Sequence, residues 1–228
     1  MIKINLVALI IDLFICAYAF YLSFLLLRRP YHPSSFNFGM ALFSMACWVL
    51  NILIIFSPGI PVGLFLENLA YFFGLWIVHY FYIFSLEFPW PSLHKKWKII
   101  IAYVVSSALS IAFFIPGFYT LGIVKDFPLL YTKINPLGNV IFLLYFSMLI
   151  LLALKNLFFN YSRSGGFVRG QLRVIIVGTF LTFAFNIFFS VGIFFITDFN
   201  TTPIGALFVV GTLFYIYLLI FRDYHVKQ

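Results

Sequence analysis

Residues Leu64–Phe88 read LFLENLAYFFGLWIVHYFYIFSLEF, and nearly all of them are apolar. As an α-helix this stretch extends for about 37 Å, enough to cross a hydrocarbon layer about 30 Å thick with some tilt. Glu67, Asn68 and His79 are polar residues inside it. A charge at the centre of a bilayer costs about 2.5–3.5 kcal/mol, so these groups must face protein or water. We therefore expect a central, enclosed helix with the rest of the chain packed around it.

The composition of the whole chain indicates an integral membrane protein. Of its 228 residues, 64% are hydrophobic, 22% are aromatic and only 9% are charged, whereas a soluble domain carries about 25% charged residues. A net charge of +8 would suggest a nucleic-acid partner in a soluble protein. Here the basic residues gather on one side of the predicted membrane region, so we expect the lipid bilayer, and no nucleic acid, as the partner.

Apolar runs separated by loops with Pro, Gly and charged residues predict an all-α bundle of seven transmembrane helices in a single domain, residues 1–228. The predicted spans are 5–27, 36–56, 64–88, 99–115, 136–159, 174–196 and 203–221. The longest loop, Phe118–Asn135, is expected to fold as a small hairpin over the outer mouth. Pro136 suits the first turn of the fifth span. Residues Asn160–Arg173 are read as a loop.

The distribution of Lys and Arg over the loops predicts the orientation of the chain. Seven spans place the termini on opposite sides of the membrane, and one side receives eleven basic residues while the other receives three, Lys3, Lys125 and Lys133. The positive-inside rule therefore puts the N-terminus outside and the C-terminus in the cytoplasm. We expect a multi-pass protein of the inner (plasma) membrane.

Most of the polar residues within the predicted spans fall in the outer half. One interpretation is a polar cavity open to the outside, with aromatic residues as its floor. The other is that these groups hydrogen-bond between packed helices and bind no ligand. The candidate ligand-binding residues under the first interpretation are Asp12, Trp48, Asn51, Glu67, Asn68, Tyr71 and Asn139.

Three titratable residues of the third span are interpreted separately. His79 follows Glu67 by about 18 Å along the helix and about 120° around it, so the two cannot form an acid–base pair. We interpret His79 as a hydrogen-bonded packing residue. Glu67 is close enough to the interface to be solvated, and Glu87 is expected to be solvated near Lys95 or Lys96.

The sequence lacks the patterns of several membrane enzymes and cofactor proteins. The last span, 203–221, has no Lys that could form a retinal Schiff base, and no H-E-x-x-H, G-x-S-x-G or P-loop pattern is present. Cys16 and Cys47 lie within apolar runs and do not suggest a disulfide or a metal site. We therefore predict no catalytic residues, no metal and no cofactor.

Four short stretches carry a resemblance to a known family: Ala46-Cys47-Trp48, Phe84–Pro89, Arg169-Gly170-Gln171-Leu172-Arg173 and Phe214–Tyr224. With the overall pattern of spans, the chain resembles the N-terminal seven-transmembrane sensor region of bacterial histidine kinases. The resemblance covers essentially all of the residues. It implies a membrane-embedded sensory input module that has no enzyme activity of its own.

The resemblance also implies partners. The 228 residues hold no phosphoacceptor helix and no ATP-binding domain, so the module would act on a cytoplasmic kinase or other output domain, within a homodimer. The signal would leave through Arg222, Asp223 and Tyr224, while Arg169 and Arg173, four residues apart, would anchor the sixth span at anionic headgroups. The alternatives from other classes are a small membrane transporter or carrier and a structural subunit without a ligand.

Overall fold

The computed structural model describes residues 2–28, 33–56, 63–90, 96–126 and 129–187. Within these ranges the chain forms six helices and one two-stranded antiparallel sheet. The elements are α1 (Ile2–Leu27), α2 (Pro33–Phe56), α3 (Leu64–Glu87), α4 (Lys96–Phe113), β1 (Thr120–Asp126), β2 (Leu129–Ile134), α5 (Pro136–Arg163) and α6 (Gly166–Ile187).

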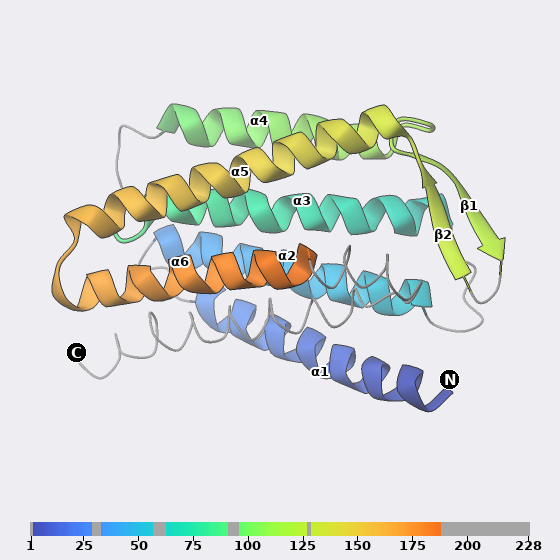
Figure 1. Cartoon of the computed structure of the whole chain (residues 1–228), viewed down its shortest axis with the longest axis horizontal. Coiled ribbons are helices and arrows are strands. Elements are labelled where there is room, and N and C mark those ends of the chain that lie inside the picture. Colours follow the sequence, from blue (N-terminus) through green and yellow to red (C-terminus); the bar gives the residue numbers. More distant parts are fainter. Residues whose placement is uncertain (1, 29–32, 57–62, 91–95, 127–128, 188–228) are drawn as a thin grey trace.

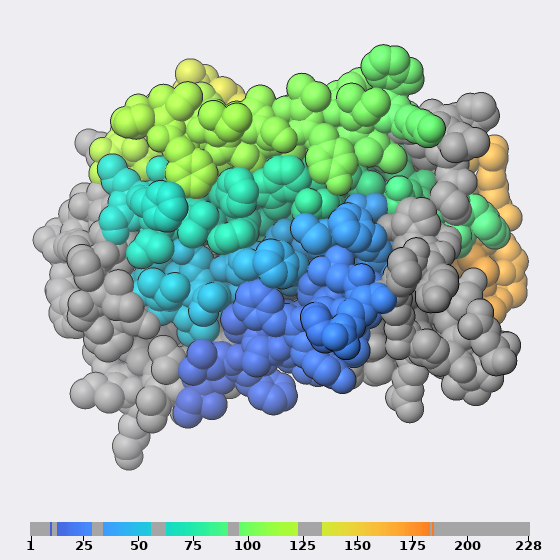
Figure 2. All heavy atoms as spheres, turned by 180° about the vertical axis from the view of Figure 1, so that it is seen from behind, coloured from blue at the N-terminus to red at the C-terminus, as the bar shows by residue number. Residues whose placement is uncertain are grey.

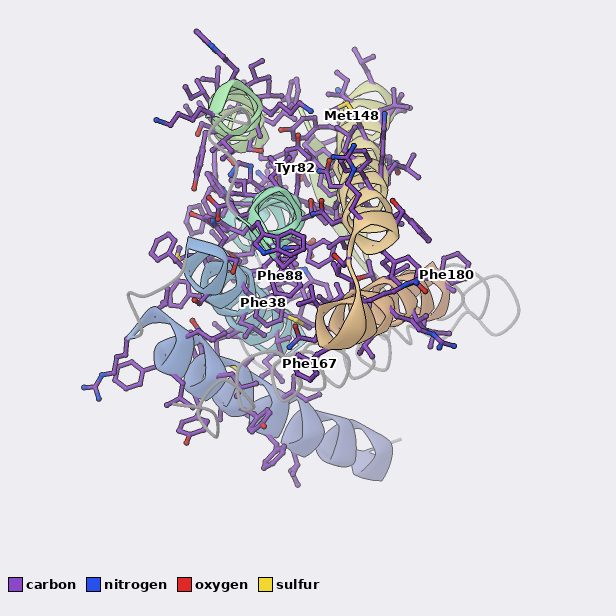
Figure 3. The ribbon with its side chains drawn as sticks, turned by 90° about the vertical axis from the view of Figure 1, so that its left-hand side faces the viewer. Phe38, Tyr82, Phe88, Met148, Phe167 and Phe180 are labelled. Carbon is purple, nitrogen blue, oxygen red and sulfur yellow. The ribbon has the colours of Figure 1, made fainter. Side chains whose placement is uncertain are left out.

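Helix α3 is the centre of the bundle. Successive helices run in opposite directions, so that α1, α3 and α5 end where α2, α4 and α6 begin (Figure 1). Viewed along the bundle, α3 lies between α2, α4 and α5 (Figure 3), and it packs against all three and against β1. The prediction of a central third helix is confirmed for the described part of the chain.

The surface of the bundle is strongly apolar. Large hydrophobic side chains are exposed on every helix from α1 to α6; examples are Phe14 (72% exposed), Ile111 (69%), Leu144 (68%) and Phe180 (65%). On the face shown in Figure 2, α4, α3, α2 and α1 follow one another, and α3 reaches the surface between α4 and α2. Such a surface is suited to contact with lipid.

Four of the described helices contain segments that are long and apolar enough to cross a membrane: Ser34–Ile55, Leu64–Glu87, Lys96–Phe113 and Pro136–Arg163. A shorter apolar helical segment covers Leu13–Leu27. The result is a helical membrane bundle, as predicted. The seventh predicted span, 203–221, lies outside the described residues.

The loop between α4 and α5 forms the predicted hairpin. Strands β1 and β2 pair from Thr120↔Ile134 to Asp126↔Leu129, with an irregularity between Thr120 and Gly122. Helix α5 begins at Pro136, as expected for a proline in the first turn. The hairpin lies at the end of the bundle where α3 begins and α4 ends (Figure 1).

The prediction that residues Asn160–Arg173 form a loop was wrong. Helix α5 continues to Arg163 and α6 begins at Gly166, which has a positive φ of 52°, so only a short turn separates them. The sequence was misleading because arginines end an apolar run of residues without ending the helix. Their side chains are exposed, so the helices extend beyond the apolar layer without burying a charge.

Candidate functional site

The base of the hairpin is hydrogen-bonded to the first turns of α3 and α5. Thr120 Oγ1 donates to Asn68 Oδ1 on α3, and Tyr119 Oη donates to Asn139 Oδ1 on α5 at 3.2 Å. Asn68 and Thr120 are both buried. Two of the predicted ligand residues, Asn68 and Asn139, are therefore brought together by the hairpin.

A close backbone approach holds the hairpin base against α5. A Cβ atom on Gly138 would lie only 2.2 Å from the carbonyl oxygen of Phe118, so no larger residue fits without a shift of the backbone. Asn135 fixes the same corner, because its Nδ2 donates to Gly117 O at 2.8 Å and its backbone N donates to Tyr119 O at 2.7 Å. Its Oδ1 caps α5 by accepting from Leu137 N at 3.0 Å.

Aromatic rings fill the space beneath the hairpin base. The rings of Tyr71 and Tyr119 have centroids 4.3 Å apart, and Phe113 and Phe142 contact Tyr119 edge-on at 5.3 and 5.8 Å. Burial raises the pKa of the Tyr119 phenol, so it stays neutral and can donate to Asn139. Tyr71, a third predicted ligand residue, therefore belongs to a packed aromatic cluster.

Two other predicted outer residues, Trp48 and Asn51, lie between α2 and α3. Asn51 is buried and its Nδ2 donates to Leu66 O at 2.8 Å, while Trp48 packs beside Leu66 on the small cluster of Ile55 and Ala70. Glu67 is only 8% exposed, so the expectation that it is solvated was wrong. It lies in the first turn of α3, where α2 and the hairpin cover the helix.

A second polar group lies deep between α3, α4 and α5. His79 is fully buried, and its Nδ1 lies 2.8 Å from Ser106 Oγ. Ser106 Oγ lies 3.0 Å from Tyr145 Oη, which donates to Ala102 O at 3.2 Å. The interpretation of His79 as a hydrogen-bonded packing residue agrees with the Nδ1 contact.

At the end opposite the hairpin, side chains from α2 and α5 hold the last turn of α3. Asn37 Nδ2 donates to Glu87 Oε2 at 2.6 Å, Asn156 Nδ2 donates to Ser85 Oγ at 3.2 Å, and Asn160 Nδ2 donates to Phe88 O at 2.7 Å. We call these contacts the amide clamp. The ring of Phe84 lies between those of Phe38 and Phe88, with centroids 5.2 Å from each, and Figure 3 labels Phe38 and Phe88. Glu87 is half-buried, so the expected solvation is only partial, and Asn37 supplies a neutral donor to its carboxylate. Its predicted neighbour Lys95 lies outside the described residues.

Exposed arginines surround the turn between α5 and α6, beside the amide clamp. The guanidinium of Arg169 lies 4.8 Å from the centre of the Tyr161 ring, and that of Arg163 lies 3.9 Å from the Phe159 ring. Arg169 and Arg173 are on one helix, four residues apart, as the anchoring hypothesis requires.

The structure thus separates the predicted ligand residues into two groups. Asn68, Tyr71 and Asn139 meet beneath the hairpin, whereas Trp48 and Asn51 lie between α2 and α3. Glu67 is buried in the first turn of α3, one helical turn before Tyr71. The side chain of Asp12 and the predicted output residues Arg222, Asp223 and Tyr224 lie outside the described part of the chain. The ligand role of all these residues stays a prediction.

Sequence reasoning missed the clamp residues Asn37, Asn156 and Asn160. A signal existed, because Asn156 and Asn160 are four residues apart in an apolar span and therefore share a face. Among the described residues, no three His, Cys, Asp or Glu side chains are grouped so that they could hold a metal ion.

Comparison with known proteins gives one match that spans the chain. The family model described as the N-terminal 7TM region of histidine kinase matches residues 6–225. No curated protein matches the chain at a significant level. Because the family match extends over almost the whole sequence, the chain belongs to the family of N-terminal seven-transmembrane regions of histidine kinases.

Proposed function

We propose that this protein is a sensory input module that passes a signal from the outer side or the interior of the membrane to a cytoplasmic output domain. Membership of the histidine-kinase sensor-region family supports this proposal over the alternative of a small transporter or carrier. The module itself performs no chemistry, and its partner is a kinase or another output domain.

The observation that carries the proposal is that α3 is hydrogen-bonded to its neighbours at both ends. Asn68 bonds to the hairpin at one end, and Ser85 and Glu87 bond to α5 and α2 at the other. These ends are about 30 Å apart along the helix, close to the thickness of the hydrocarbon layer. A displacement of the outer end of α3 is therefore transmitted to the amide clamp.

The proposed signal is a ligand or bilayer property that acts in the outer half. It shifts the packing only by its differential affinity for two states of the bundle. The readout leaves through span seven and Arg222, Asp223 and Tyr224, within a homodimer in the inner membrane. In this orientation the N-terminus is outside, and Arg169 and Arg173 lie at the cytoplasmic headgroups.

Hydrogen exchange of the full chain in lipid nanodiscs tests the coupling along α3. We compare Asn68→Ala with a matched variant, Ser23→Ala, which removes one buried hydrogen bond, from Ser23 Oγ to Gly39 O at 2.9 Å, between α1 and α2. The proposal expects Asn68→Ala to change protection at residues 156–170 as well as near the hairpin.

The partner of Ser23, Gly39, is two residues from the clamp residue Asn37, so Ser23→Ala shows the change that a direct disturbance of the clamp end produces. If exchange in Asn68→Ala changes only near residues 63–72 and 117–121, then α3 does not couple the two ends and the proposed mechanism is rejected.

A further inference from the structure

Three buried polar atoms on the α3–α4 interface have no hydrogen-bond partner within the described residues: Trp76 Nε1, His79 Nε2 and Ser110 Oγ. His79 is fully buried and Ser110 is 5% exposed. Hydrocarbon offers no water to such groups, so an unsatisfied one inside a membrane protein is costly. Three of them on one interface indicate a site for a molecule that can form hydrogen bonds.

Helices α3 and α4 run antiparallel, and their pairing places these three atoms near one another. The rings of Phe72 and Phe114 have centroids 6.0 Å apart, and His79 Nδ1 contacts Ser106 Oγ at 2.8 Å. Trp76 follows Phe72 by four residues and Ser110 precedes Phe114 by four, so they lie at the same level. His79 is about one helical turn, roughly 5 Å, further along α3.

The hydrogen bonds among His79, Ser106 and Tyr145 determine which ring nitrogen of His79 can accept a hydrogen bond. Tyr145 gives its only hydroxyl proton to Ala102 O, so its oxygen accepts from Ser106 Oγ. Ser106 has then used its own proton and must accept from His79 Nδ1–H. The remaining Nε2 of neutral His79 is therefore a hydrogen-bond acceptor.

The unsatisfied atoms define the chemistry of the bound group. Trp76 Nε1–H can only donate, His79 Nε2 can only accept, and Ser110 Oγ can do either. A neutral hydroxyl matches this set, because its oxygen accepts from Trp76 while its proton is donated to His79. A carboxylate offers no proton to Nε2, and an ammonium group offers no acceptor to Trp76.

The position of the site favours a molecule that arrives from the bilayer. Trp76 is at the middle of α3, far from either aqueous side, and Trp76, Tyr80 and Tyr103 are only half-buried. On the face shown in Figure 2, α3 and α4 reach the surface next to each other. We propose that the α3–α4 interface binds the hydroxyl group of a neutral, alcohol-bearing amphiphile that enters laterally and leaves its apolar tail in the lipid.

Photolabelling of the full chain in nanodiscs tests this proposal, with a decanol that carries a diazirine as the probe. Labelled peptides are identified by mass spectrometry. We expect labels in residues 64–87 and 96–113, competition by 1-decanol, and no competition by decane. Trp76→Phe and Ser110→Ala should each lower the labelling at least about threefold, the effect of losing one hydrogen bond.

Matched variants on α4 serve as controls. Trp97 is 75% exposed and Ser107 is exposed, so Trp97→Phe and Ser107→Ala should leave the labelling unchanged. Since Ser110 Oγ has no partner among the described residues, Ser110→Ala should not lower the thermal stability of the unlabelled protein.

Three results would overturn the proposal: equal labelling in the site and control variants, equal competition by decane and 1-decanol, or labelling of α3 and α4 no higher than that of other helices. The last result would leave water as the group that satisfies these atoms. The proposed site stands independently of the proposed signalling function, because the assay measures binding alone.

Discussion

The hairpin base and the amide clamp, which contact opposite ends of α3, are held together in different ways. The hairpin base is held to the start of α5 largely by backbone, with Gly138 against the carbonyl of Phe118 and the backbone N of Asn135 bonded to Tyr119 O. At the opposite end every link of the amide clamp is made by an asparagine side chain, and Asn37 and Asn160 are examples.

This difference has a mechanical consequence. A backbone fit without space for one Cβ atom cannot change unless the whole hairpin base moves. A side-chain hydrogen bond contributes only about 0.5–1.5 kcal/mol net, so a modest differential affinity of a ligand is enough to exchange one such bond for another. We infer that the hairpin base and the start of α5 form a rigid unit, and that the amide clamp is the contact that rearranges when the outer end of α3 is displaced.

The largest expected effect is at the hairpin base, in Gly138→Ala. The added Cβ atom would lie 2.2 Å from Phe118 O, which is backbone and cannot turn aside. We expect a loss of about 3 kcal/mol in the free energy of unfolding, at the upper end for overpacking. Equilibrium unfolding in mixed detergent micelles measures this change.

Gly170→Ala is the matched control for the glycine substitution. Gly170 is exposed within α6, and a Cβ atom added to it would meet nothing within 4 Å beyond its chain neighbours and the backbone of its own helix. Alanine is the better helix former, so this variant should be neutral or slightly more stable. Equal stability of the two variants would show that the hairpin base is as adaptable as an exposed helix face.

The next effect concerns the amide clamp, in Asn37→Ala. The half-buried carboxylate of Glu87 loses a donor at 2.6 Å, and hydrogen bonds to charged groups contribute about 1.5–3 kcal/mol. We expect a loss of about 2 kcal/mol in the free energy of unfolding. A double-mutant cycle with Glu87→Ala isolates the pair, and a coupling energy near zero would remove Asn37 from the clamp.

Much of the fold could be predicted from the sequence, because apolar length and turn residues act locally. The run from Leu64 to Phe88 identified the central helix, and Pro136 marked the start of α5. The sequence could not reveal where α6 begins, because arginines end a hydrophobic run without ending a helix.

The polar contacts were harder to predict, since they depend on which helix faces meet. Glu67 and Glu87 were expected in solvent, but Glu67 is buried, and Glu87 is half-buried with its carboxylate bonded to Asn37 of α2. Asn68 was identified as important, but its partner Thr120 comes from a hairpin 52 residues away in the sequence. Spacing within one helix contains no information on such a contact.

An effect smaller than that of Asn37→Ala is expected from the contact between anionic lipid and the arginines beside the amide clamp. Arg169 and Arg173 are exposed on the first turns of α6, and each basic residue near an anionic surface contributes about 1 kcal/mol. Replacing both with alanine should abolish most of the added thermal stability that the protein gains in anionic over zwitterionic nanodiscs. The double lysine variant, which keeps the charge, should retain it. An unchanged preference in the alanine variant would refute the anchoring hypothesis.

The smallest effect distinguishes side-chain from backbone support at the hairpin end, in Tyr119→Phe. The variant keeps the ring against Tyr71 and loses only the bond to Asn139 Oδ1, which is long at 3.2 Å. Asn139 is partly exposed, so water can replace the hydrogen bond that its oxygen loses. We therefore expect a loss of only about 0.5–1 kcal/mol in the free energy of unfolding. A loss as large as that of Gly138→Ala would mean that the hairpin base depends on side-chain hydrogen bonds as much as the clamp does, and the contrast between the hairpin base and the amide clamp would disappear.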